Sequence, residues 1–350
     1  MSMICSNDGM QQKFYDEKSN YWYKEDYLGT EGLSEHITSI LLENSDLPHV
    51  EYKACQFEMG QKEVIGCKSK NFLKENERLV SAYELFEKYK NIDIAKKIAG
   101  QSVIDKIKYF VENVIEITGI HDFGQYLTKM LQLDAVTKNE DRHFKNICFI
   151  VDENNQFRVC PVFDNGAAFL SDKYTYGSLS KVTEDKLKSV EAKPFSIDFD
   201  EQLDACESLY PANINLKQIK EISLYPKEIL TRLYGNEEVE ACLDLIRDAE
   251  RKYTYLFYDY DKLKNQLYDQ LNEIESLGFT IKQNFVNGKW SVEIDKTTYF
   301  YYSDTKAGLN KVIEDLSLYI EQEKQKAITN VNEQVYMDEQ ENIEKFFREI

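Results

Sequence analysis

The chain carries the sequence NEDRHFKN from Asn139 to Asn146 and VFDNG from Val162 to Gly166. Two apolar runs lie between these segments, separated by the polar stretch 152–156. Apolar runs on either side of a short polar stretch are typical of a β-hairpin. The sequence therefore predicts a β-hairpin with one polar segment before its first strand and another after its second strand, both at the end opposite the turn.

The register of this hairpin decides which polar residues meet. If residues 153 and 157 pair, each further pair of residue numbers has the same sum, and Asn146 faces Asp164 at the open end. An amide oxygen beside a carboxylate suits a hard cation such as Mg²⁺, which binds few protein oxygens and completes its shell with water and substrate phosphates. We therefore expect Asn146 and Asp164 to form a magnesium site.

Asp141 lies five residues before Asn146, in a turn that follows an apolar helix predicted over 123–131. An Asp five positions before an Asn, a hairpin, and then Asp-x-Gly at 164–166 is the order found in protein-kinase sites. Each piece alone is common, because Asp-Asn-Gly is an ordinary turn and the Asp–Asn spacing recurs by chance. The combination favours a functional site over unrelated turn residues.

The pattern Asn139-x-Asp141-Arg142-His143-x-x-Asn146, followed by Phe163-Asp164, resembles the catalytic and metal-binding loops of the HipA-like serine/threonine kinases. These are bacterial toxin kinases whose fold is similar to that of protein kinases and phosphatidylinositol kinases. The resemblance implies that Asp141 orients the acceptor hydroxyl and that Asn146 and Asp164 bind Mg²⁺. His143 stands where the family has a His, and two roles stay open for it, ordering the loop or contacting phosphate.

The segment Ser6-Asn7-Asp8-Gly9-Met10-Gln11-Gln12-Lys13 resembles the phosphate-covering loop of the family, although no GxGxxG or Walker A motif is present. Gly9 permits a tight turn, and successive backbone N–H groups can cradle phosphate. The resemblance implies that Gly9, Gln11 and Lys13 contact ATP and that Ser6 is autophosphorylated, which silences the kinase. A phosphate of about −2 charge at Ser6 would repel the phosphates of ATP.

Lys24 ends a short aromatic run, Trp22-Tyr23-Lys24, and Glu35 follows eleven residues later in a predicted helix. In protein kinases a strand lysine grips the phosphates of ATP and pairs with a helix glutamate. We expect Lys24 and Glu35 to form this pair, with Glu31 as the competing partner. Residues 69–73 fall where the family has its adenine-binding hinge.

The sequence predicts an α+β chain with a two-lobed, protein-kinase-like fold. Residues 1–75 are expected to form a β-rich N-lobe with one helix, and 76–256 a C-lobe that is helical over 76–140 and again after 197. Residues 257–350 are expected to form an accessory α-β-β-β-α module with an acidic tail, in part because Asn287-Gly288 is a strong hairpin signal. The resemblance covers roughly residues 5–255 and does not explain this module. The extra N-terminal subdomain of larger HipA proteins is expected to be absent.

Composition narrows the range of partners. The chain has 350 residues, with 43 basic and 62 acidic side chains and a formal net charge of −19. This charge argues against broad binding to nucleic acids and against binding to an anionic membrane surface. Seven cysteines without a CxxC pair and a first segment unlike a signal peptide favour a cytoplasmic protein. The expected activity is ATP- and Mg²⁺-dependent phosphorylation of protein Ser or Thr.

Two alternatives to a protein kinase stay open. They are a lipid or small-molecule kinase and a pseudokinase that serves as a binding scaffold. By resemblance, the protein is a toxin kinase, and a small helix-turn-helix antitoxin is the expected partner. The substrate, the oligomeric state and the role of the last module do not follow from the sequence.

Overall fold

The computed structural model describes residues 4–6, 12–181, 183–223, 227–257, 260–286, 289–302, 308–309 and 311–329. The chain divides into two compact units, Met1–Phe257 and Tyr258–Ile350. Each unit has its own core and is described separately. Both helices and sheets are present, so the α+β class expected from the sequence is correct. No helix in the described part of the chain is long and apolar enough to cross a membrane.

The first sheet of unit 1 is antiparallel and has the strand order β1-β2-β3-β5-β4. Its strands are β1 (Ile4–Ser6), β2 (Lys13–Asp16), β3 (Tyr21–Glu25), β4 (Tyr52–Met59) and β5 (Lys62–Lys70). Helix α1 (Glu31–Leu41) packs against β4 and β5, and its apolar side chains Leu33, Ile37 and Leu41 are buried. The apolar spacing in the sequence had predicted this helix.

A second sheet in unit 1 joins segments that are distant in sequence. It has the order β6-β7-β8, with β6 (Arg78–Ser81), β7 (Cys148–Val151) and β8 (Phe157–Val159). The expectation that 76–140 is helical was wrong at β6. These four residues are too few to carry a periodic signal, and their strand depends on pairing with β7, about 70 residues away.

The register expected for the β7–β8 hairpin was also wrong. Val151 pairs with Phe157, so the strands are shifted by two residues from the pairing of 153 with 157. Asp152 causes the shift, because its Oδ1 accepts the N–H groups of Asn154 and Gln156 at 2.9 and 2.8 Å and closes a longer polar turn. Asn146 and Asp164 therefore do not face each other as a strand pair, and β8 has ended before Asp164.

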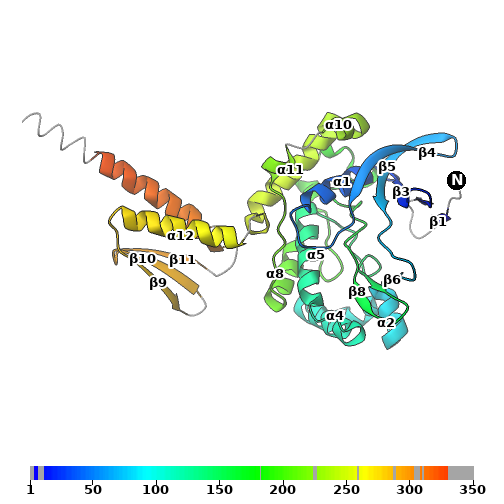
Figure 1. Ribbon diagram of the computed structural model, residues 1–350, viewed down its shortest axis with the longest axis horizontal. Coiled ribbons are helices and arrows are strands. Elements are labelled where there is room, and N and C mark those ends of the chain that lie inside the picture. The colour runs from blue at the N-terminus through cyan, green and yellow to red at the C-terminus, as the bar shows by residue number, and fades with distance from the viewer. Residues whose placement is uncertain are drawn as a thin grey trace, which may run out of the picture. The chain divides into compact units, whose positions relative to one another are not determined.

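The remaining elements of unit 1 are mostly helices (Figure 1). Aromatic and aliphatic side chains of these helices are buried in the core of the unit. The elements are α2 (Ala82–Lys90), α3 (Ile94–Ile98), α4 (Val103–Thr118), α5 (Phe123–Thr137), α6 (Lys173–Tyr176), η1 (Leu179–Lys181), α7 (Glu184–Lys188), α8 (Phe199–Leu209), α9 (Ile219–Ile222), α10 (Glu228–Tyr234), α11 (Asn236–Lys252) and η2 (Thr254–Leu256). Helix α5 is the most deeply buried of the long helices and leads directly into the segment 139–146.

Unit 2 contains α12 (Tyr260–Ser276), a meander of β9 (Ile281–Val286), β10 (Lys289–Ile294) and β11 (Thr298–Tyr302), and helical residues 308–309 and 311–329. Its buried residues come from both helical segments and from one face of the sheet, among them Leu267, Val292 and Leu316. The tail 330–350, which the sequence analysis marked as acidic, lies outside the described residues.

Candidate active site

Lys24 lies in β3 with its side chain turned toward α1 and only 6% exposed. Its Nζ is 2.7 Å from Oε1 of Glu35, which α1 presents one turn from its N-terminus. The same Nζ lies 4.8 Å above the ring of Tyr52. The second carboxylate oxygen of Glu35 accepts the backbone N–H of Asn165 at 3.0 Å. Glu35 therefore links the first sheet to the segment that carries Asp164.

Glu31, the competing partner for Lys24, has a different role. Its carboxylate accepts the backbone N–H groups of Tyr27, Leu28 and Gly29 at 2.6–3.1 Å. These bonds satisfy donors in the turn that leads into α1, and a negative charge at this end of a helix is favourable. The structure thus pairs Lys24 with Glu35 and uses Glu31 to fix the turn before the helix.

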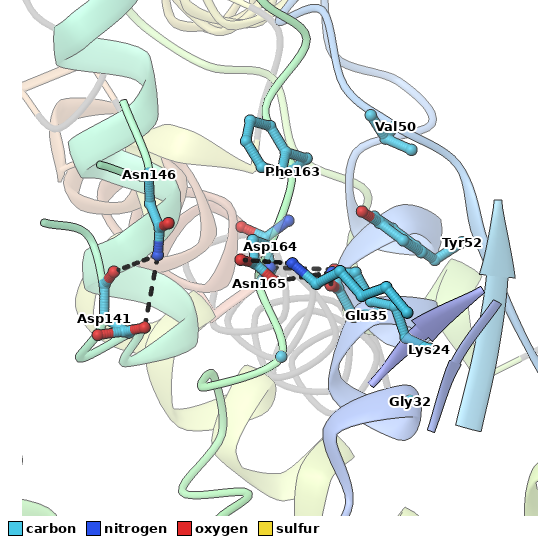
Figure 2. Close-up of polar contacts among 12 residues, drawn as sticks. Lys24, Gly32, Glu35, Val50, Tyr52, Asp141, Asn146, Phe163, Asp164 and Asn165 are labelled. Carbon is cyan, nitrogen blue, oxygen red and sulfur yellow. Dashed lines mark hydrogen bonds and ion pairs between the residues drawn. The ribbon is translucent and has the colours of Figure 1, made fainter. Parts of the chain in front are cut away.

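Asp164 lies beside Lys24, and Figure 2 shows the two side chains meeting. Oδ1 of Asp164 is 2.7 Å from Lys24 Nζ, and Oδ2 is 3.6 Å from Nζ of Lys13, which β2 places next to β3. The backbone of Asp164 has φ of 59°, an uncommon conformation for a residue with a side chain. Although burial alone would raise it, the pKa of Asp164 is lowered by Lys24 and Lys13, so this carboxylate is anionic at neutral pH.

Asp141 and Asn146 lie in the turn after α5. Nδ2 of Asn146 donates to the backbone oxygen of Asp141 at 2.8 Å and to its Oδ2 at 3.4 Å (Figure 2). Because both bonds use the amide nitrogen, Oδ1 of Asn146 is turned away from Asp141. The side chain of Asp141 is 45% exposed, which leaves its carboxylate accessible to an incoming hydroxyl group.

A buried ion pair holds this turn in place, and the sequence analysis gave it no role. Arg142 binds both carboxylate oxygens of Asp134 in α5, at 2.9 and 3.0 Å, and both side chains are fully buried. Arg142 also donates to the backbone oxygen of Phe163 at 3.1 Å and to Oδ1 of Asn165 at 2.7 Å. One guanidinium thus fixes the turn of Asp141 relative to the segment of Asp164. The Arg-His pair after Asp141 was the available signal.

His143 lies next to Asp141, with Nε2 3.8 Å from its Oδ1. Among the described residues the buried Nδ1 of His143 has no hydrogen-bond partner. Its backbone N–H donates to the backbone oxygen of Asp141 at 2.9 Å. The ring therefore does not order the loop through Nδ1, and its other nitrogen faces the region of the Asp141 carboxylate.

The phosphate-loop residues are only partly within the described structure. Gly9 and Gln11 lie outside the described residues. Lys13 is described, and the backbone of Ser6 in β1 pairs with it. Of these residues, Lys13 contacts the site, because its Nζ lies 3.6 Å from Oδ2 of Asp164.

The described oxygen ligands fit Mg²⁺ better than a soft metal ion. No group of three or more His, Cys, Asp or Glu side chains suited to a metal occurs among the residues that the structure covers. Asp164 offers a carboxylate and Asn146 an amide oxygen, from two segments that Arg142 holds together. A site with two protein oxygens suits Mg²⁺, which completes its octahedron with water and phosphate oxygens.

An apolar cluster adjoins the charged site. Val50, Tyr52 and Cys67 are buried, and Phe72 and Phe163 pack against them with their two rings 6.0 Å apart. Figure 2 shows Val50, Tyr52 and Phe163 around the Lys24–Asp164 pair. Phe72 belongs to 69–73, where the resembled family has its hinge. The cluster itself was not predicted, because its members come from four separate segments of the sequence.

Asp26 connects the end of β3 to α1 and gives the site a pH-dependent stability. Its Oδ1 accepts the N–H of Gly32 at 2.6 Å, and burial raises the pKa of Asp26 to about 7, with the nearby charge of Glu31 adding to the rise. Because the pKa of Asp26 is higher in the folded protein than in the unfolded chain, proton binding to Asp26 stabilises the fold. This contribution to the free energy of unfolding is fully present below pH about 4, the unfolded-state pKa, and is lost as the pH rises through about 7.

We therefore expect Asp26→Asn, which stays neutral, to gain stability relative to wild type as the pH rises. The gap between their thermal unfolding midpoints should widen by several degrees between pH 5 and pH 8. Scanning fluorimetry across this range measures the gap, with the exposed Asp46→Asn as control. A gap that is the same at both pH values, or equally pH-dependent in the control, would contradict this role of Asp26.

No protein-family model matches the chain, and no curated protein matches it significantly. Among solved structures, it is similar to the proinflammatory kinase CtkA of Helicobacter pylori, with 15% identity and a TM-score of 0.45 over 72% of this chain and 98% of that one.

A second neighbour comes from the complex of Shewanella oneidensis HipA and HipB, a toxin–antitoxin system, with operator DNA. It has 15% identity and a TM-score of 0.36 over 69% of this chain and 67% of that one. These two structural neighbours are a kinase and the HipA protein of a toxin–antitoxin system. At this identity and with TM-scores below 0.5, neither likeness carries an activity over to this chain, whose function must be inferred from its own residues.

Proposed function

We propose that this protein is an ATP- and Mg²⁺-dependent serine/threonine protein kinase. One observation carries the proposal: Lys24 bridges Glu35 and Asp164 at 2.7 Å each, while Arg142 fixes the Asp141–Asn146 turn to the same Asp164 segment. Six polar residues from β3, α1 and two loops are thus joined in one network. A structural role alone would not require an accessible carboxylate in a turn that Arg142 joins to the segment of an anionic carboxylate held by two lysines.

Each residue has a task in phosphoryl transfer. Lys24, oriented by Glu35, binds the phosphates of ATP together with Lys13, and Asn146 and Asp164 hold the metal ion. Bound Mg²⁺ supplies charge neutralisation at the phosphate oxygens. Asp141 accepts a hydrogen bond from the acceptor hydroxyl and orients its oxygen toward the γ-phosphorus. Catalysis then comes from positioning and from fixed charges.

The apolar cluster completes the nucleotide site in this proposal. The adenine ring would pack among Val50, Tyr52 and Phe163, next to residues 69–73. Residues 1–75 would act as the N-lobe and 76–256 as the C-lobe, with 257–350 as an accessory module. Gly9 and Gln11 would cover the phosphates, as the sequence resemblance implies.

The biological role in this proposal is that of a cytoplasmic toxin kinase. A small helix-turn-helix antitoxin would be its partner, and Ser6 its autophosphorylation site. These three statements rest on the sequence resemblance. The net charge of −19 supports a protein acceptor over an anionic lipid surface.

The binding part of the proposal is tested with Asp164→Ala. Without this carboxylate, we expect ATP affinity in Mg²⁺ to fall at least about tenfold, or about 1.4 kcal/mol, and to become independent of Mg²⁺. Isothermal titration calorimetry measures affinity, and circular dichroism checks the fold. Asp46→Ala is the matched control, since Asp46 also pairs with a lysine, Lys129, at 2.6 Å. Unchanged, Mg²⁺-dependent affinity in Asp164→Ala would mean that Asp164 is only a turn residue.

A further inference from the structure

The loop before α8 places one more cation at the candidate site. Phe195 in this loop is fully buried, with its ring 5.5 Å from that of Phe110 and 5.7 Å from that of Phe144. Phe144 belongs to the same turn as Asp141, three residues away. Packing of the two aromatic rings therefore attaches the loop to the turn that carries the proposed catalytic carboxylate.

Hydrogen bonds fix the backbone of this loop on both sides of Phe195. Gln202 donates from Nε2 to the backbone oxygen of Lys193 at 3.2 Å, and Lys106 donates from Nζ to that of Phe195 at 2.8 Å. The N–H of Ala192 donates to the backbone oxygen of Ile197 at 2.8 Å and closes the loop. Because the donors come from α4, α8 and the loop itself, the Cα of Lys193 has a defined position.

The side chain of Lys193 extends from this fixed point toward Asp141. Its Nζ is 3.7 Å from Oδ1 of Asp141, and the side chain is 48% exposed. This separation exceeds a normal hydrogen bond, so the ammonium group is near the carboxylate but is not held by it. Lys24, in contrast, is buried between Glu35 and Asp164. Lys193, unlike Lys24, is therefore free to move by an ångström or two toward a ligand at Asp141.

We propose that Lys193 is a catalytic residue that binds the γ-phosphoryl group during transfer, an inference that rests on the proposed kinase function. In this step the bond from the γ-phosphorus to the β–γ bridging oxygen breaks, and a bond to the acceptor hydroxyl oxygen forms. The hydroxyl proton passes to Asp141, and ADP leaves. Lys193 neutralises charge on the phosphoryl oxygens, close to where the acceptor must lie.

Chemical footprinting tests this contact without relying on turnover. Lys193 and the exposed Lys188, which pairs with Glu184 at 2.7 Å, are acetylated with isotopically labelled acetic anhydride and quantified by mass spectrometry. With Mg²⁺ present, we expect an ATP analogue with an imido bridge between the β- and γ-phosphates to slow acetylation of Lys193 at least about fivefold relative to ADP. Lys188 should react equally with both nucleotides. Equal reactivity of Lys193 with both nucleotides would overturn the inference.

Steady-state kinetics of Lys193 variants provide a second test. Lys193→Met should lower kcat about a hundredfold or more and change KM for ATP by less than about threefold, because the lost contact matters most in the transition state. Lys193→Arg should recover at least about tenfold of this loss, and Lys188→Met should match wild type. Thermal unfolding midpoints within a degree of wild type would exclude a folding defect.

The pH profile separates a phosphate contact from support of Asp141. Among the described residues, Lys193 and His143 face the side chain of Asp141, and Glu140 is next to it in the chain. If Lys193 only kept Asp141 ionised, the defect of Lys193→Met would vanish as the pH rises, and the inference would be wrong. A defect that persists up to pH 8.5 supports it. A wild-type chain that binds no nucleotide would instead refute the proposed function.

Discussion

Asp141→Asn should lower kcat for phosphate transfer by about 10²–10⁴-fold while leaving the affinity for ATP and Mg²⁺ within about threefold of wild type. Asn has the same shape as Asp, but it cannot take the proton of the acceptor hydroxyl. The side chain of Asp141 is nearly half exposed, and it lies 3.4 Å from Nδ2 of Asn146 and more than 3.5 Å from the side-chain nitrogens of His143 and Lys193. The folded structure should therefore tolerate the change.

A filter assay with labelled ATP measures turnover for this variant, and calorimetry measures nucleotide affinity. Asp46→Asn serves as the control on the exposed surface. If Asp141→Asn keeps more than about a tenth of the wild-type kcat, the carboxylate does not assist the transfer. Asp141 would then be a turn residue and the proposed mechanism would lose its base.

The second large effect concerns the stability that the buried ion pair of Arg142 and Asp134 gives to the fold. Arg142→Met should lower the free energy of unfolding by about 3–5 kcal/mol, because it leaves the carboxylate of Asp134 buried without its partner. It also removes the donors to Phe163 and Asn165. The double variant Asp134→Leu/Arg142→Met should be less destabilised than Arg142→Met alone, since no charge then stays buried.

Urea unfolding can follow unit 1 selectively. The chain has two tryptophans, Trp22 in β3 of unit 1 and Trp290 in β10 of unit 2. In a Trp290→Phe background, fluorescence reports unit 1 alone. A loss below about 1 kcal/mol for Arg142→Met would show that the buried pair contributes little, as is the case for exposed pairs.

Local sequence was sufficient for much of the fold. The helices α1, α4 and α5 lie where the sequence predicts helices, because apolar spacing along a helix is a short-range pattern. Strand β6 was missed because its four residues form a strand through pairing with the distant β7. The β7–β8 register was wrong by two residues because side-chain bonds of Asp152 lengthen the turn, which strand periodicity does not encode.

In the candidate site, too, features set by local sequence were predicted and features set by distant contacts were not. The spacing of Asp141, Asn146 and Asp164 was visible in the sequence, and so was the choice of Glu35 or Glu31 as the partner of Lys24. Only the geometry distinguishes these two glutamates, since Glu31 is used by three backbone N–H groups. Arg142 lies in a quoted segment but received no role, and Lys193 was not predicted to belong to the site. Their partners, Asp134 and Asp141, depend on burial and on the path of a loop more than 50 residues away.

The most direct test of the central claim is phosphate transfer by the purified full chain. The protein is incubated with ATP, Mg²⁺ and dephosphorylated casein as a Ser/Thr acceptor, and intact mass and phosphosite mapping follow, with Asp141→Asn and a metal-free sample as controls. We predict phosphate on Ser or Thr of the chain or of casein, with Ser6 among the sites, and none in either control. No phosphate on either protein, from a folded wild-type chain that binds ATP, would contradict the claim that this is a protein kinase.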